Sequence, residues 1–217
     1  MKTIIYVDGF NLYHRALKKT QHKWLDLHAL CQAALPKNNT ITSINYYTAR
    51  VSGKISPDAA KDQNTYLKAL GTLPNLRIHY GNFQVTEKHM YLCQPLDFQP
   101  ACTTLPQPTP RFARVVKIEE KGSDVNLGVH LVRDAFSGAF EHAAIITNDT
   151  DLLEPIRIVV KEANLPVTLL SPVSKPAGSL RGIATYIRHI DRYLSKAQFA
   201  ASLTGPDGQP IHKPNDW

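Results

Sequence analysis

The sequence predicts an α/β fold, a three-layer α/β/α sandwich built around a mainly parallel central sheet. Two observations support this prediction. Short apolar segments alternate with amphipathic segments along the 217 residues, and 43% of the residues are hydrophobic, which is enough for a sizeable core. Strands separated by helices pair in parallel through right-handed crossovers, and this leaves helices on both faces of one sheet.

The first half of the chain contains three predicted strands, at residues 3–7, 41–51 and 76–84. Helical patterns lie between them, at residues 10–19, 27–35 and 56–70. Two of these helices begin with recognisable signals: Asp26 is a candidate N-cap, and Ser56 with Pro57 supplies a cap and a first-turn proline. Because a strand pattern begins almost at the N-terminus, no signal peptide is expected.

Residues 85–112 interrupt this alternation. The segment has little periodicity and contains five prolines, Pro95, Pro100, Pro106, Pro108 and Pro110. Because proline has no backbone N–H to donate to a sheet, we expect a proline-rich insertion that lies against the rim of the domain and adds no central strand.

The alternation resumes in the second half, with strands predicted at residues 113–118, 143–147 and 166–170 and helices at residues 124–136 and 152–163. The helix at 124–136 carries two apolar stripes, one of Val125, Val129, Val132 and Phe136 and one of Leu127, Leu131 and Ala135. Burial is therefore expected over much of its girth. Residues 179–199 are expected to be mostly helical. We expect one domain over residues 1–200, followed by a loose tail over residues 201–217.

The composition bears on partners and compartment. Lysine and arginine total 25 against 18 aspartates and glutamates, which gives a net charge of +7 and favours polyanionic partners or, more simply, solubility. No apolar stretch is long enough to span a bilayer, so no membrane association is expected. Three cysteines are too few for a disulfide framework and predict a reducing, cytoplasmic compartment.

The cysteines themselves offer little chemistry. Cys31 lies on an apolar helix face and is expected in the core. His89, Cys93 and Cys102 are too few and too poorly spaced for a structural zinc site, so the last two are interpreted as ordinary cysteines.

Four aspartates follow predicted strands. Asp8 closes the first strand, Asp149 and Asp151 follow the strand that ends at Thr147, and Asp124 begins the helix after the strand that ends near Ile118. In an open parallel sheet the ligand crevice lies at the carboxyl ends of the strands. We therefore expect these carboxylates to meet at one site.

Clustered carboxylates repel one another and raise their own pKa values unless a cation neutralises them. Oxygen ligands favour a hard cation, Mg²⁺ or Mn²⁺, which can activate water and polarise a phosphodiester. Each aspartate also has a structural alternative. Asp8 with Gly9 is a common turn pair, Asp124 is a candidate helix N-cap, and Asp151 with Glu154 resembles a capping box.

Three stretches carry a resemblance to a known family. Residues 6–12 (YVDGFNL), 121–125 (KGSDV) and 146–152 (ITNDTDL) resemble the three signature stretches of the NYN domain family, part of the PIN-like nuclease superfamily. The resemblance implies a PIN-like, Rossmann-like fold, a divalent metal and cleavage of RNA. It places metal binding and catalysis at Asp8, Asp124 and Asp149, with Asp151 in support.

Several polar residues near these stretches are candidates for contacting substrate. By its motif position Asn11 would orient Asp8 or a phosphate, and Asn148 is assigned to the same side of the site. Lys121 and Arg114 precede Asp124 and are expected to grip phosphates, with a solvated face as the alternative. Tyr13, Tyr46 and Tyr47 are candidates for base stacking, although core packing is expected for at least one of the tandem pair.

The function predicted from the sequence is a metal-dependent endoribonuclease, with RNA as partner and homodimerisation left open. One alternative is a non-catalytic RNA-binding module. Another is a phosphatase or nucleotide hydrolase with Asp8 as nucleophile, but Phe10 stands where that chemistry favours a second aspartate.

Overall fold

The computed structural model describes residues 1–53, 56–94, 96–97, 110–215 and 217. Its centre is a six-stranded sheet in the order β3-β2-β1-β6-β7-β8, in which every neighbouring pair is parallel. The strands are β1 (Lys2–Asp8), β2 (Thr40–Thr48), β3 (Leu76–Tyr80), β6 (His142–Ile146), β7 (Val167–Ser171) and β8 (Tyr186–His189). The predicted α/β fold with a mainly parallel sheet is thus confirmed.

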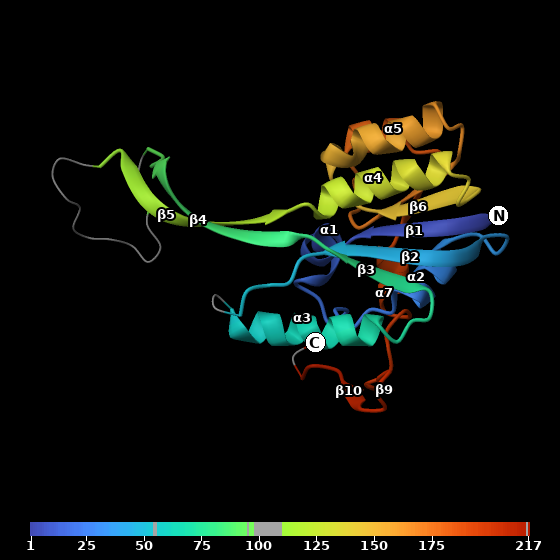
Figure 1. The fold of residues 1–217 in the computed structure, drawn as a ribbon, viewed down its shortest axis with the longest axis horizontal. Coiled ribbons are helices and arrows are strands. Elements are labelled where there is room, and N and C mark those ends of the chain that lie inside the picture. The colour runs from blue at the N-terminus through green and yellow to red at the C-terminus, as the bar shows by residue number, and fades with distance from the viewer. Residues whose placement is uncertain (54–55, 95, 98–109, 216) are drawn as a thin grey trace.

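Helices cover both faces of this sheet and complete three layers (Figure 1). One face carries α4 (Ser123–Phe136), α5 (Leu153–Lys161) and α6 (Gly178–Ile183). The other carries α1 (Gly9–Leu12), the π-helical turn η1 (Tyr13–Leu17), α2 (Leu27–Ala34), α3 (Pro57–Leu70) and α7 (Asp191–Leu194). None of the helices in the described residues is long and apolar enough to cross a membrane.

The central strands are apolar because both of their faces are covered. All five residues of β6 and of β7 are buried, as are six of the seven residues of β1. Their side chains divide between two cores: Ile5 and Val7 face one cluster, whereas Tyr6 faces the other. The predicted helices over residues 27–35 and 56–70 also form, and Asp26 caps the first of them by accepting from the backbone N–H of Ala29 at 2.9 Å.

The clearest departure from prediction is a hairpin arm formed by β4 (Asn82–Tyr91) and β5 (Phe112–Lys121), a separate two-stranded antiparallel sheet. It projects from one end of the domain and does not lie against the rim (Figure 1). Residues 85–91, expected as an insertion without regular structure, are strand, and the strand predicted at 76–84 divides into β3 and β4. No residue of the arm joins the central sheet. Pro95, Pro100, Pro106, Pro108 and Cys102 lie outside the described residues.

The C-terminal region also differs from its prediction. Residues 179–199 are not mostly helical, because β8 adds a sixth strand to the sheet between α6 and α7. The expected loose tail contains a hairpin of β9 (Ser202–Thr204) and β10 (Pro210–His212). Ile211 is buried in the core, and the ring of Trp217 lies 6.2 Å from that of Trp24. Apolar contact therefore holds this segment to the domain.

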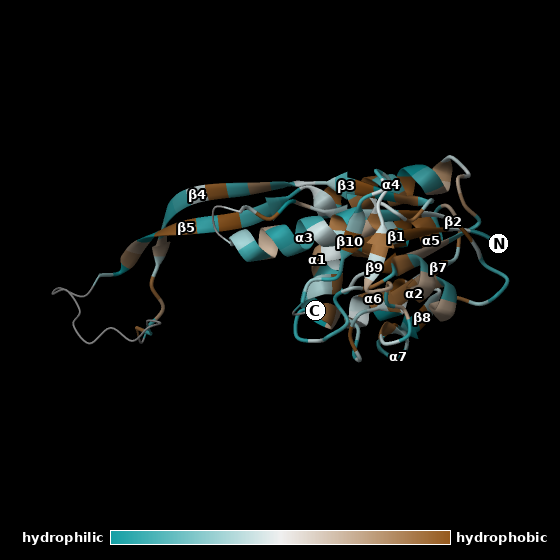
Figure 2. Cartoon of the chain, turned by 90° about the horizontal axis from the view of Figure 1, so that it is seen from below, coloured by the Kyte–Doolittle hydropathy of each residue, from teal (hydrophilic) through white to brown (hydrophobic). Residues whose placement is uncertain are grey.

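Only one of the two stripes on α4 is buried. Leu127 and Leu131 are fully covered, whereas Val125, Val129 and Phe136 remain 68%, 59% and 62% exposed. The arm likewise has exposed apolar residues, and Figure 2 shows them alternating with hydrophilic residues along β4 and β5. The expected burial of the stripe of Val125, Val129 and Phe136 is wrong, because one face of the helix packs on the sheet and the opposite face has no neighbouring layer.

Candidate functional site

Asp8 stands where β1 ends and α1 begins. It is 4% exposed, and its carboxylate accepts from the backbone N–H of Asn11 at 2.9 Å and from the hydroxyl of Thr147 at 3.0 Å. The tight turn depends on Gly9, because a Cβ there would lie 2.6 Å from the Tyr46 ring. Asp8 is therefore a helix N-cap, and its carboxylate is held by two donors.

Asp149 follows β6, the strand that pairs directly with β1. Its backbone N–H donates to the hydroxyl of Thr147 at 3.0 Å, and Thr147 in turn donates to Asp8. The Asp149 carboxylate accepts from the backbone N–H of Asp151 at 3.0 Å, so Asp149 caps the short helical turn η2 (Thr150–Leu152). One buried hydroxyl thus ties the ends of both strands together.

Asp124 reaches the site by another route. It lies in the first turn of α4, whose N-cap is Gly122 at φ 96°, and the preceding strand β5 belongs to the arm. The strand-end argument, correct for β1 and β6, does not apply here. Glu120 accepts from the backbone N–H of Ser123 at 3.1 Å and helps to shape this turn.

These carboxylates influence one another. Burial raises the pKa of Asp8 to about 7, with a smaller contribution from the negative charges of Asp124 and Asp149. Burial also raises the pKa of Asp124 to about 6, assisted by Asp149, Glu120 and Asp151. The site therefore holds closely spaced acidic groups whose ionised forms are disfavoured without a counter-charge.

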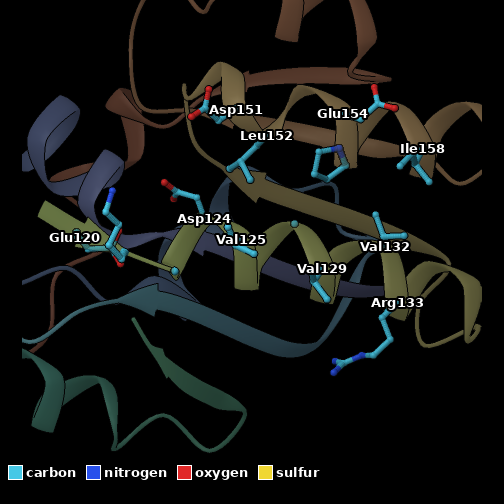
Figure 3. A pocket seen from close by; sticks show the side chains of 14 residues that line it. Glu120, Asp124, Val125, Val129, Val132, Arg133, Asp151, Leu152, Glu154 and Ile158 are labelled. Carbon is cyan, nitrogen blue, oxygen red and sulfur yellow. The ribbon is translucent and has the colours of Figure 1, made fainter. Parts of the chain in front are cut away.

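Two cavities meet at Asp124. The smaller, of about 350 Å³, is lined by Asp8, Asp124 and Asp149, with Asn11, His14 and Arg15 at its edge. The larger, of about 770 Å³, runs between α4 and α5; Figure 3 shows Asp124 and Asp151 at one end and Val125, Val129 and Val132 along it. Asp151 is exposed and faces the larger cavity. Because Asp149 provides the cap, the capping-box alternative for Asp151 does not hold.

The arrangement of the acidic side chains and the chemistry of their oxygen atoms bear differently on metal binding. Among the residues that the structure describes, no group of three or more His, Cys, Asp or Glu side chains is arranged so that it could hold a metal ion. The donor chemistry nevertheless suits Mg²⁺ or Mn²⁺, since carboxylate oxygens line the smaller cavity. Mg²⁺ usually takes only one or two protein carboxylates and completes its shell with water and substrate phosphate.

The side chains of Asn11 and Asn148 both hydrogen-bond to the backbone of other segments. The side-chain oxygen of Asn11 accepts from the backbone N–H of Asn148 at 2.9 Å, and that of Asn148 accepts from the backbone N–H of Ala177 at 2.9 Å. Asn11 orients Asp8 through its backbone N–H only.

The basic candidates divide between the two ends of the arm. Lys121 lines the larger cavity. Arg114 pairs with Glu87 and stands seven residues further along β5, about 24 Å away at 3.4 Å per residue. Only Lys121 is therefore placed beside the aspartates.

Sequence reasoning did not select Thr147, Glu120, His14 or Arg15 as site residues. Thr147 was identifiable as the last residue before Asn148 and Asp149, but its role depends on Asp8 lying opposite. His14 and Arg15 lie in η1, which follows α1 directly, and both line the smaller cavity with Asp8. Cys31 is buried as expected, and Cys93 is an exposed free thiol.

With this geometry established, comparison with known proteins identifies the family. The family model described as "NYN domain" matches residues 2–191. The chain belongs to the NYN domain family. NYN domains are nuclease-like, which agrees with the acidic site at the ends of β1 and β6.

Two individual proteins resemble this NYN domain. The 6-hydroxy-3-succinoylpyridine 3-monooxygenase HspA of Pseudomonas putida is 28% identical over 243 aligned positions, which cover 100% of this chain and 75% of that protein. A Vibrio parahaemolyticus protein of unknown function, VPA0982, superposes with a TM-score of 0.52 at 14% identity, over 88% of this chain and 93% of that one. The second likeness concerns the fold alone.

Proposed function

We propose that this NYN domain is a metal-dependent endoribonuclease that acts on RNA in the cytoplasm. The observation that carries the proposal is the shared cavity of Asp8, Asp124 and Asp149, two of which have raised pKa values. A set of carboxylates facing one cavity is unfavourable for a protein that only binds phosphate, because like charges repel. A divalent cation removes that conflict.

One or two of the carboxylates of Asp8, Asp124 and Asp149 would hold Mg²⁺ or Mn²⁺, with water and substrate phosphate as its other ligands, and Asp151 would add negative charge from the neighbouring cavity. The bound cation supplies Lewis-acid polarisation of the phosphodiester and a water of lowered pKa. The reaction would leave a 3′-hydroxyl and a 5′-phosphate.

The chain's own residues do the positioning. Thr147 and the backbone N–H of Asn11 hold Asp8 in one orientation, and Asn11 fixes the loop that carries Asp149 through its bond to Asn148. Arg15 and His14 border the same cavity, and Lys121 lies beside Glu120 near Asp124. The positive charges of Arg15 and Lys121 would bind phosphates on either side of the scissile bond, because charge-assisted hydrogen bonds to phosphate are strong. Burial, with Lys18 and Arg15 nearby, lowers the pKa of His14, so its imidazole would contribute as a neutral group.

The test is an incubation of purified protein with labelled single-stranded RNA, structured RNA and matching DNA, in Mg²⁺, Mn²⁺ or EDTA. We expect RNA to be cut internally with either metal and to remain intact in EDTA. Binding without cleavage under every metal condition would instead support a non-catalytic RNA-binding module. Release of phosphate from nucleotides alone would indicate a phosphatase.

A second candidate function rests on the Pseudomonas putida relative, whose match covers this whole chain. Its name describes oxygenation of a hydroxypyridine acid, a reaction that consumes O₂ and two electrons from an external reductant. Incubating the protein with that pyridine, a nicotinamide reductant and air would test this candidate. Reductant consumption matched by a hydroxylated product would favour it over RNA cleavage.

A further inference from the structure

A third cavity, of about 510 Å³, opens beside the aspartates. It lies between α1, η1, β2, α3 and the base of the arm, and it shares Phe10 and His14 with the cavity of Asp8 and Asp149. Nothing in the proposed cleavage chemistry uses it. Its volume falls in the range of about 300–1,000 Å³ typical of small-molecule sites.

Aromatic rings dominate the lining: Phe10, Tyr13, Tyr46, Tyr66, Phe83 and Trp217. Phe10 meets Phe83 edge-on at 5.6 Å, and Tyr66 lies 5.8 Å from Trp217, so neighbouring walls support one another. These rings come from distant parts of the sequence, since Phe83 belongs to the arm and Trp217 to the C-terminal segment. Such walls accept a flat, polarisable ring by stacking and edge contacts.

The charged groups of the lining are two carboxylates and two lysines. Asp58 and Asp62 of α3 offer carboxylates, and Asp62 also accepts from the Trp217 indole N–H at 3.3 Å. Gln63 is already committed to the backbone of Val51 and Ala49, at 2.8 and 2.9 Å. Lys18 and Lys23 border the cavity and would favour a ligand that also carries negative charge.

We propose that this cavity binds a planar nitrogen heterocycle that bears N–H donors and is attached to an acidic group. Stacking on the aromatic walls would supply affinity, and Asp58 and Asp62 would accept from the ring's N–H groups. Two sources share this chemistry. One source is a base of an RNA strand whose adjoining phosphate lies at Asp8 and Asp149, and this source rests on the proposed function. The other source is a free hydroxypyridine acid.

Tryptophan fluorescence provides the measurement, because Trp217 lines the cavity and the chain's other tryptophan, Trp24, contacts it. The protein would be titrated in EDTA with the four nucleoside 5′-monophosphates, with ribose 5-phosphate and with a hydroxypyridine carboxylic acid. We expect heterocycles to quench the emission and ribose 5-phosphate to leave it unchanged.

Two variants locate the binding. Phe83→Ala removes one aromatic wall and should raise the Kd for heterocycles roughly tenfold. Stacking of a base contributes about 1–3 kcal/mol, and 1.4 kcal/mol corresponds to a factor of ten. Asp62→Asn should weaken the binding of heterocycles that carry N–H donors more than the binding of those that lack them. This second variant keeps the test valid if Phe83→Ala disturbs the arm. Phe136→Ala, on the exposed face of α4, is the matched control and should leave the Kd unchanged.

The outcomes separate this inference from the nuclease proposal. Quenching by nucleotides alone identifies RNA as the source, and quenching by the pyridine acid alone identifies a free heterocycle. Quenching by neither, equal quenching by ribose 5-phosphate, or equal Kd values in the Phe83 and Phe136 variants would overturn the inference. The binding titration is made in EDTA and does not depend on cleavage. If heterocycles bind but the protein does not cut RNA in Mg²⁺ or Mn²⁺, the nuclease proposal is refuted and the inference about this cavity stands.

Discussion

The strands β5 and β6 both lead to an aspartate of the candidate site, yet they differ in almost every other respect. β6 is entirely buried in the centre of the sheet, between β1 and β7. β5 is part of a projecting hairpin in which Val116 and Ile118 are exposed. Asp149 follows β6 on a loop held by Thr147 and Asn11, whereas Asp124 reaches the site on the first turn of α4.

This difference shows that two kinds of support converge on one cavity. Asp8 and Asp149 depend on the register of adjacent buried strands, which any shift in the core would disturb. Asp124 depends on where α4 begins, set by Gly122 and by the bond from Ser123 to Glu120. The part of the arm that lies beyond Glu120 can therefore change while the aspartates stay in place.

The largest expected effect concerns the rigid pair. Asp8→Asn and Asp149→Asn each remove one negative charge while keeping the side chain's shape, so RNA cleavage should fall a hundredfold or more, about 3 kcal/mol of transition-state stabilisation. RNA binding should hold or tighten, because a charge that repels phosphate is gone. Steady-state cleavage and equilibrium binding measure the two effects. Asp191→Asn, an exposed aspartate of α7, is the control, and full activity in both site variants would remove the mechanism.

Core and arm positions should differ sharply in stability. Ile145 in β6 is 0% exposed and Val116 in β5 is 61% exposed. Ile145→Ala should lower the free energy of unfolding by about 2–5 kcal/mol, because it leaves a cavity in a packed core, whereas Val116→Ala should change it by about 0.5 kcal/mol or less. Urea denaturation measures both. Comparable losses would mean that the arm is packed against something in solution.

The metal-free protein should lose stability as the pH rises from about 4 to about 7. The folded-state pKa of Asp8 is about 7, above the ordinary value of 3.8, so the folded protein binds the proton more tightly than the unfolded chain. Stability is then greatest below the unfolded pKa and falls as the pH passes through the folded one. Asp124, with a pKa of about 6, acts in the same direction.

Urea denaturation in EDTA at pH 5 and pH 7.5 checks this expectation. Asp8→Asn should flatten the decline, because its amide cannot ionise, and Asp191→Asn should leave it intact. Parallel curves for the wild type and Asp8→Asn would contradict the proposed cause. Added Mg²⁺ should reduce the decline in the wild type, since a ligand that binds the folded state stabilises it.

The smallest effect on cleavage is expected from shortening the arm. Val85 faces Ile118 across the hairpin, so residues 86–117 can be replaced by an Asn-Gly turn without changing the register. An isolated two-stranded hairpin contributes little stability, and the unfolding free energy should change by about 1 kcal/mol or less. Cleavage of a short RNA should persist, although substrate choice is free to change. Loss of cooperative melting would show that the arm belongs to the folding unit.

Much of this molecule was predictable from local patterns. The apolar runs of β1, β6 and β7 indicated a parallel sheet because both faces of those strands are buried, and the predicted helices over residues 27–35 and 56–70 form close to their expected bounds. Asp8 and Asp149 followed from the same reasoning, since the carboxyl ends of parallel strands share one edge.

Only the tertiary structure decided the rest. The apolar stripe of Val125, Val129 and Phe136 has the same periodicity as that of Leu127 and Leu131, yet no layer covers it. Residues 112–121 have the pattern of a strand, but a pattern does not specify the partner strand, and β5 pairs with β4 outside the sheet. The contacts of Thr147 with Asp8, and of Trp217 with Trp24, join residues more than a hundred positions apart. Local propensity determines which segments become helices and strands, whereas long-range packing determines which of their faces are covered and which side chains meet.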